Sequence, residues 1–185
     1  EMTRKTRKIG LGVMGFADLL YQLGIPYNSE EALQTAGSVV RFIQETSHET
    51  SQTLVEERGV FANWDRSTYK DRGIKRRNAT TTTIAPTGTL SIIAGCSSGI
   101  EPLFALSFVR TVMDNDKLME VNPVFEKTAK ERGFYSPELM DQIARQGSIH
   151  AMEEIPEDVR RVFVTAHDVS PEWHIRMQAA FQQFT

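Results

Sequence analysis

Apolar residues recur at near-helical spacing between residues 9 and 23, and the sequence GIP at residues 24–26 ends the run. This spacing places apolar side chains on one face of a helix. The pattern therefore predicts a helix over residues 9–23. Its apolar positions are Leu11, Met14, Leu19 and Leu23.

A longer stripe with three- and four-residue spacing predicts a second helix, from Ser29 to Arg58, that ends at Gly59. Asn28 or Ser29 can cap it, and Asn28 with Glu31 has the offset of a capping box. The stripe consists of Leu33, Ala36, Val40, Ile43, Ser47, Thr50 and Leu54. Core packing is the simplest interpretation, and the small polar residues in its middle also suit close packing against another backbone.

Strands are expected later in the chain. The β-branched run TTTTIA at residues 80–85 predicts one, and residues 104–113 contain a second. A turn at residues 86–89 separates the first strand from a short element over residues 90–94. After Asn115 the pattern is helical. The expected helices span residues 123–132, 136–147 and 156–163, and from 170 to the end of the chain. Because the last one is still apparently helical where the sequence stops, we expect a fragment of a larger domain.

The composition narrows the function classes. Of 185 residues, 40% are hydrophobic and 24% charged, which suits a packed core and excludes bulk disorder. No apolar run is long enough for a membrane span. A net charge of -3 argues against a general nucleic-acid binder. The single cysteine excludes an internal disulfide framework and a cysteine-based zinc site, and makes a reducing, cytoplasmic setting the expectation.

Three candidate motifs are rejected. Residues 10–15 fit the G-x-G-x-x-G pattern, but the preceding TRKTRKI cannot form the buried strand that a dinucleotide site requires. We expect these glycines to let a helix lie close to a neighbouring backbone. The four histidines have no metal-ligand spacing. His167 and Asp168 are adjacent in the chain, so they are not expected to face each other as a catalytic dyad.

A basic cluster lies between residues 70 and 77. A solvated connector is the favoured interpretation and an anion site is the alternative. The cluster consists of Lys70, Arg72, Lys75, Arg76 and Arg77.

The segment Pro86-Thr87-Gly88-Thr89-Leu90 carries the most chemistry. A predicted strand leads into a turn with two hydroxyl groups and one glycine. Gly88 lets a ligand approach the backbone, and hydroxyl and N–H groups can converge on one anion. A helix that begins at Thr89 would add its positive end. Phosphate binding and an ordinary turn are equally consistent with this pattern.

Three stretches in order resemble the large chain of ribonucleotide reductases. RNATTTTIAPTGTLSIIAGCSSGIEPLFA, residues 77–105, looks like that family's phosphate loop and the G-I-E-P sequence that follows it. IGLGVMGFADLLYQLGIPY, residues 9–27, resembles its upstream helix. TAHDVSPEWHIRMQAAFQ, residues 165–182, is similar to the adenosylcobalamin-dependent branch, as is the PTGT form of the loop.

The resemblance implies an α/β fold in which residues 1–185 are a helix-rich, C-terminal portion of a ten-stranded α/β barrel. It implies that Pro86, Thr87, Gly88, Thr89 and Leu90 hold the phosphates of a ribonucleoside diphosphate. The whole enzyme would reduce the ribose by radical chemistry, with adenosylcobalamin as cofactor and a thioredoxin-type reductant as partner. The remainder of the reductase chain would be a further partner. Whether the enzyme forms a homodimer is left open.

The chain departs from the family in its cysteines. The finger-loop, early-strand and C-terminal cysteines of the family are absent, so no catalytic or metal-binding residue is assigned here. Cys96 falls where the family has no catalytic cysteine, and we expect it to be incidental. Two alternatives remain, a standalone nucleotide- or phosphate-binding module and a structural remnant without a ligand.

Overall fold

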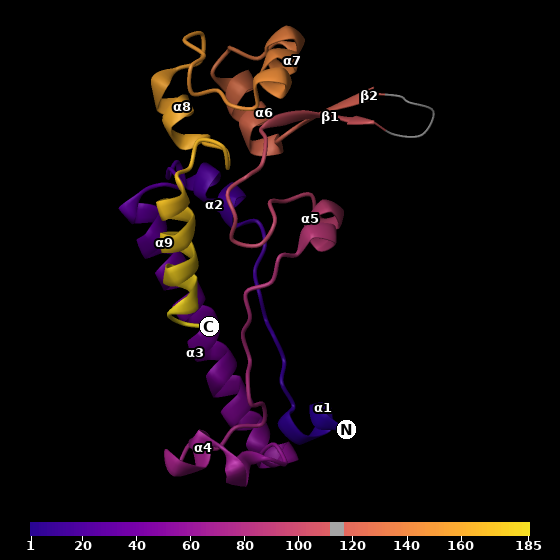
Figure 1. The fold of residues 1–185 in the computed structure, drawn as a ribbon, viewed down its shortest axis with the longest axis vertical. Coiled ribbons are helices and arrows are strands. Elements are labelled where there is room, and N and C mark those ends of the chain that lie inside the picture. Colours follow the sequence, from indigo (N-terminus) through magenta and orange to yellow (C-terminus); the bar gives the residue numbers. More distant parts are fainter. Residues whose placement is uncertain (112–116) are drawn as a thin grey trace. The chain divides into compact units, whose positions relative to one another are not determined.

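The computed structural model describes residues 1–111 and 117–185. These residues form two compact units, each built from separate parts of the sequence. The first unit contains residues 1–13, 34–85 and 179–185, and the second contains residues 14–33 and 86–178. Figure 1 shows the elements of both units, coloured along the chain.

The first unit pairs two extended segments around a short parallel bridge. Leu11 and Thr82 form this bridge. The N–H of Leu11 donates to the carbonyl of Thr81 at 2.8 Å, and the N–H of Thr83 donates to the carbonyl of Leu11 at 3.0 Å. The strand expected over residues 80–85 is therefore extended but forms only an isolated bridge. The helix expected over residues 9–23 is wrong in its first half, because residues 9–13 pair with the second segment.

Two glycines explain why the first segment can lie so close to the second. A Cβ added at Gly10 would lie 2.8 Å from Cγ2 of Thr83, and one added at Gly12 would lie 3.0 Å from its carbonyl oxygen. The glycines do allow a close backbone approach, as expected. The approaching segment is extended rather than helical, since a parallel ladder needs this geometry.

Helix α3, Glu30–Arg58, confirms the long predicted helix. Ser29 caps it, since its Oγ accepts a hydrogen bond from the N–H of Ala32 at 3.1 Å. The polar middle of the helix faces the extended segment of the first unit. Ser47 Oγ donates to Thr81 Oγ1 at 2.9 Å, and Ser51 Oγ donates to Asn78 Oδ1 at 3.0 Å. Ser51 is buried where the stripe had placed Thr50, which is exposed.

Short helices complete the first unit. They are α1, Met2–Thr6, the 3₁₀ turn η1, Trp64–Arg66, and α4, Thr68–Asp71. Helix α9, Pro171–Gln182, begins in the second unit and ends in the first.

The second unit holds most of the helices. They are α2, Phe16–Leu23, α5, Gly88–Ala94, α6, Pro123–Glu131, α7, Pro137–Gln146, and α8, Glu157–Val162. Asn122 and Ser136 cap α6 and α7 with their side chains, and a proline follows each cap. The last four predicted helices thus match α6, α7, α8 and α9 closely.

An antiparallel hairpin belongs to the same unit. It pairs β1, Ser107–Thr111, with β2, Lys117–Val121, in the register Val109 opposite Met119. Strand β1 confirms the expectation for residues 104–113, of which Val112 and Met113 lie outside the described residues. Strand β2 corrects the helix expected after Asn115, a residue that is itself outside the described part. Figure 1 shows the hairpin beside α6 and α7.

A continuous hydrophobic core fills the second unit. Phe125 lies at the centre of this core, and its ring centroid is 5.2 Å from the ring centroid of Phe163. The ring centroids of Phe163 and Tyr21 are 4.7 Å apart. Burial of such side chains is worth roughly 1.5–3 kcal/mol each. The core also contains Leu106, Ala129, Met140, Ile143, Ile149, Met152, Ile155 and Val159.

The ten strands of the expected barrel are not all present here. In residues 1–111 and 117–185, the hairpin and the isolated bridge are the β-structure that forms. The fold is helix-rich, as predicted for a portion of such a barrel. None of the helices in the same ranges is both long and apolar enough to cross a membrane.

Candidate functional site

The predicted phosphate loop is a tight turn at the start of α5. Thr87 is the N-cap and has φ 53°, a left-handed conformation that is rare for a β-branched residue. The helix begins at Gly88, one residue before the predicted start. Strained backbone of this kind persists where surrounding contacts hold it.

One such contact joins Thr87 to the G-I-E-P sequence. Its Oγ1 accepts a hydrogen bond from the N–H of Gly99 at 2.7 Å. The hydroxyl proton of Thr87 stays available for an anionic oxygen, since a hydroxyl group can accept and donate at once. The structure therefore brings together two sequence motifs that the resemblance had picked out separately.

Four of the five residues of the predicted loop are exposed, namely Pro86, Gly88, Thr89 and Leu90. A Cβ added at Gly88 would meet no described atom within 4 Å. Gly88 is thus not needed for packing, and its missing side chain leaves space beside the first N–H groups of α5.

Serines fix the far side of the loop. Ser91 Oγ donates to the carbonyl of Gly88 at 2.9 Å and lies 2.7 Å from Ser98 Oγ. The N–H of Cys96 donates to the carbonyl of Ser91 at 3.0 Å. These contacts hold residues 95–98 against α5, and they are a part of the site that the sequence did not reveal.

Asp18 anchors the same residues to the core of the second unit. It is buried, and its Oδ2 accepts a hydrogen bond from the N–H of Ser97 at 2.6 Å. Its Oδ1 accepts from Nδ2 of Asn122 at 2.8 Å. A buried carboxylate needs such donors. No sequence pattern indicates this role, because Asp18 is separated from both partners by about 80 residues or more.

Tyr27 fixes the G-I-E-P sequence at another point. Its hydroxyl donates to the carbonyl of Ile100 at 2.8 Å. Burial, followed by the charge of Glu101, raises the pKa of Tyr27 far above its usual value, so the phenol stays a neutral donor. This hydrogen bond attaches the turn at residues 99–102 to the segment that follows α2.

Cys96 has the environment of a structural thiol. It is half-buried, and a Cβ added at Gly15 would lie 3.4 Å from its Cβ. Burial and the nearby charge of Asp18 raise the pKa of the Cys96 thiol. A reactive cysteine has the opposite shift, because the thiolate is the nucleophile.

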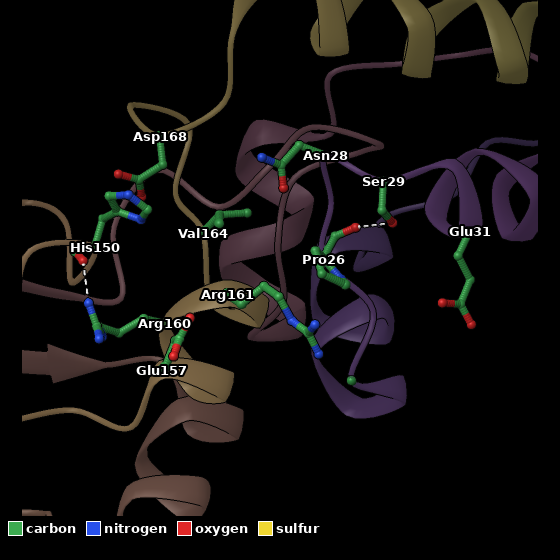
Figure 2. A pocket seen from close by; sticks show the side chains of 11 residues that line it. Pro26, Asn28, Ser29, Glu31, His150, Glu157, Arg160, Arg161, Val164 and Asp168 are labelled. Carbon is green, nitrogen blue, oxygen red and sulfur yellow. Dashed lines mark hydrogen bonds between the residues drawn. The ribbon is translucent and has the colours of Figure 1, made fainter.

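A separate cavity of about 760 Å³ lies in the second unit (Figure 2). The segment that leads into α3 contributes Asn28 and Ser29, and α8 contributes Arg160 and Arg161. Sequence analysis missed this cavity, since nothing in the pattern joins residues 24–31 to residues 150–168. Its charges are of both signs, and Arg160 is already held by the carbonyls of Ile155 and His150.

The side chains of His167 and Asp168 contact different neighbours. Asp168 accepts hydrogen bonds from Ser148 and from both the N–H and the hydroxyl of Thr165. The ring of His167 lies edge-on to Phe104, with 5.1 Å between centroids. Across the described ranges, no group of three or more histidine, cysteine or acidic residues could hold a metal ion.

The basic cluster at residues 70–77 is not a simple solvated connector. Arg76 is buried and donates to Tyr69 Oη at 2.9 Å and to Thr81 Oγ1 at 3.3 Å. Arg77 Nη1 donates to the carbonyl of Arg58 at 2.7 Å. Lys70 does lie on the surface, 3.1 Å from Asp65. The favoured interpretation is therefore wrong for the two arginines, whose long side chains reach back to the end of α3 and to the extended segment.

Comparison with known proteins shows the family of this chain. The chain matches the family described as "Ribonucleotide reductase, barrel domain" over residues 1–76 and 72–185. The chain therefore belongs to the ribonucleotide reductase barrel-domain family.

Its relatives point to one branch of that family. It is 58% identical to a vitamin B12-dependent ribonucleoside-diphosphate reductase of Thermoplasma acidophilum, over 100% of this chain and 24% of the relative. It is 50% identical to the enzyme of the same name from Mycobacterium tuberculosis, over 99% of this chain and 26% of the relative. The chain thus spans about a quarter of the length of these curated relatives.

A solved structure agrees at the level of the fold. The class Id ribonucleotide reductase alpha subunit of Actinobacillus ureae superimposes with a TM-score of 0.82 at 26% identity. The match covers 99% of this chain and 32% of that subunit.

Proposed function

We propose that this chain is part of an adenosylcobalamin-dependent ribonucleoside-diphosphate reductase, in which it holds the phosphates of the substrate. The observation that carries the proposal is the hydrogen bond from the N–H of Gly99 to Thr87 Oγ1, which fixes an exposed, cation-free phosphate loop. The names and identities of the relatives support the reaction and the cofactor.

The loop would bind its ligand mainly with neutral donors. Thr87 and Thr89 supply hydroxyl groups, Gly88 and its neighbours supply N–H groups, and Pro86 and Leu90 flank them. Hydrogen bonds to a charged acceptor contribute about 1.5–3 kcal/mol each. Rigid attachment through Ser91, Asp18 and Tyr27 keeps these donors in place before the substrate arrives.

The radical chemistry belongs to the remainder of the reductase. Reduction of the ribose requires a thiyl radical and a pair of reducing thiols, and this chain has one cysteine. Adenosylcobalamin supplies the radical when bound. The cavity of Figure 2 is lined by charged side chains rather than by a broad apolar face, so it does not fit a corrin ring. We assign the cofactor's site to residues beyond this chain.

The proposal extends to partners and location. A thioredoxin-type protein would restore the reducing thiols, and nucleotide substrates place the enzyme in the cytoplasm. A homodimer is the oligomer that we propose for the whole reductase.

The test uses the reductase at its natural length. Gly88→Val adds a side chain beside the N–H groups of α5, where it meets no described atom within 4 Å, so the fold is expected to survive. Ala94→Val places a similar side chain at the exposed other end of the same helix and is the matched control.

We expect Gly88→Val to weaken ribonucleoside diphosphate binding by about tenfold or more in equilibrium dialysis, consistent with the loss of at least one charge-assisted hydrogen bond. Ala94→Val is expected to bind as the unchanged protein does. Equal affinity in all three proteins would contradict the loop assignment. A full-length protein that forms no deoxyribonucleotide with adenosylcobalamin and dithiol would contradict the reductase activity itself.

A further inference from the structure

A second cavity, of about 310 Å³, lies in the first unit and is lined by basic residues. Four of its nine lining residues are uncharged and none is acidic. The other five are Arg4, Arg7, Lys8, Arg58 and Arg77. We call this hollow, with its five cationic side chains, the basic cavity.

Three separate segments build the basic cavity. Arg7 ends α1 in a left-handed conformation with φ 51°, and its carbonyl accepts a hydrogen bond from Nδ2 of Asn78 at 2.8 Å. This bond fixes the residue 4–8 segment to the segment that follows Arg77. Arg77 Nη1 in turn donates to the last carbonyls of α3, those of Arg58 at 2.7 Å and Gly59 at 3.4 Å. The cations are thus brought together by hydrogen bonds from side chains to backbone carbonyls.

Among the described residues, four of these five cations have no ion pair. Within the ranges 1–111 and 117–185, Arg4, Arg7 and Lys8 form no ion pair. Arg58 reaches a carboxylate only at 4.0 Å, from Glu57. Arg77 bonds to neutral carbonyl groups, which leave its charge in place.

This clustering is unusual for the chain, which carries a net charge of -3. No acidic side chain of the described residues lines this hollow, whereas Lys5, which lies nearby on α1, is 3.1 Å from Glu1. Like charges that converge on one hollow repel each other, and an anion relieves this repulsion.

We propose that the basic cavity binds the polyphosphate group of a small ligand. Four of its five cations are arginines, whose planar guanidinium groups match the oxygens of a phosphate. A single carboxylate would compensate one charge of five, whereas a tri- or pyrophosphate carries several. The volume is at the lower end for small-molecule sites, which suits a phosphate chain better than a large ligand.

This site is distinct from the phosphate loop. Residues 86–90 belong to the second unit and contribute no cation, while the basic cavity belongs to the first. Binding at one site can therefore fail without any consequence for the other proposal.

The experiment measures binding of inorganic tripolyphosphate by calorimetry, with the full-length reductase carrying Gly88→Val so that the phosphate loop is blocked. The test variant adds Arg4→Ala and Lys8→Ala, two exposed side chains without hydrogen bonds to other described residues. The matched control adds Lys5→Ala and Lys127→Ala, which remove the same charge from positions outside the cavity.

We expect the control to bind as the Gly88→Val parent does, and the test variant to bind at least tenfold more weakly. Binding in the parent should also weaken as salt is raised. If ATP displaces tripolyphosphate, the natural source of the phosphates is a nucleotide. If ATP does not displace it, the natural ligand is a free polyphosphate. No tripolyphosphate binding in the parent, or equal weakening in test and control variants, would overturn the proposal.

Discussion

The carboxylate of Asp18 accepts a hydrogen bond from the side-chain amide of Asn122 at 2.8 Å, across 104 residues of sequence. Asn122 uses its remaining amide oxygen to cap α6, accepting from the N–H groups of Val124 and Phe125. Asp18 also accepts from the N–H of Ser97. One buried carboxylate thus links α2, the start of α6 and the loop behind the proposed phosphate site.

Asp18→Asn is expected to destabilise the chain by roughly 3 kcal/mol. The new NH₂ group would face either the N–H of Ser97 or the Nδ2 group of Asn122, so that two donors meet and one hydrogen bond is lost. Urea unfolding measures the loss. Asp141→Asn, which breaks only the surface pair with Arg145, is the control and should stay within about 1 kcal/mol of the unchanged chain. A similar effect of both substitutions would refute the central role of Asp18.

Thr87 should act on substrate binding through its hydroxyl group. In the full-length reductase, Thr87→Ala is expected to weaken ribonucleoside diphosphate affinity by about tenfold or more, because both the anchor to Gly99 and a donor to the phosphates are lost. Thr87→Ser keeps the hydroxyl and should remain within about threefold, since that bond is retained. Equilibrium dialysis compares the two, and equal losses would assign the effect to packing of the methyl group.

Cys96 should react slowly with alkylating agents. Its raised pKa lowers the thiolate fraction at any given pH, so iodoacetamide at pH 8 should modify it more slowly than it modifies free cysteine. The rate should still be rising above the pH at which free cysteine reaches its plateau. We also expect Cys96→Ala in the full-length enzyme to retain turnover within a few-fold. Fast alkylation at neutral pH, or loss of turnover by orders of magnitude, would place this thiol among the reacting groups.

Gly12→Ala should destabilise the first unit. Its new Cβ would lie 3.0 Å from the carbonyl oxygen of Thr83, so this backbone atom, in the segment that forms the parallel bridge, would have to shift by a few tenths of an ångström. We expect a loss of roughly 1–3 kcal/mol in urea unfolding. Gly88→Ala, whose Cβ meets open space, is the control and should lose little or nothing.

The 185 residues alone should form no deoxyribonucleotide. The reaction needs three thiols acting together and the chain supplies one. Chromatography after long incubation with adenosylcobalamin, dithiol and ribonucleotides tests this expectation. Product above the cobalamin-only control, abolished by Cys96→Ala, would show that the assignment of the radical chemistry to other residues is wrong.

The sequence predicted those parts of the fold that local patterns determine. Helix α3 and helices α6 to α9 have clear apolar periodicity or cap residues, so the positions of these elements were largely correct. The hairpin strand β2 was missed, because KLMEV at residues 117–121 has no strict alternation and owes its strand to pairing with β1. The apolar spacing of residues 9–13 predicts a helix, and only pairing with the distant segment Thr81–Thr83 makes them extended.

The candidate site, like the fold, could be predicted from the sequence only in part. The turn at Thr87 and Gly88 was visible as a hydroxyl- and glycine-rich sequence. Its supports were not visible, because Asp18 and Tyr27 act through contacts more than 70 residues away. The contacts of Arg76 and Arg77 could not be predicted either, since a run of basic residues does not indicate which side chains turn inward.

The bridge between Leu11 and Thr82 also has a consequence for synthesis of the protein. The two residues are 71 positions apart, so the first segment leaves the ribosome long before its partner exists. At 5–20 residues per second this interval is roughly 4 to 14 s. Throughout that time Leu11 has an unpaired backbone edge. The charged TRKTRK sequence, which ends three residues before Leu11, is well placed to keep the nascent chain from pairing with others.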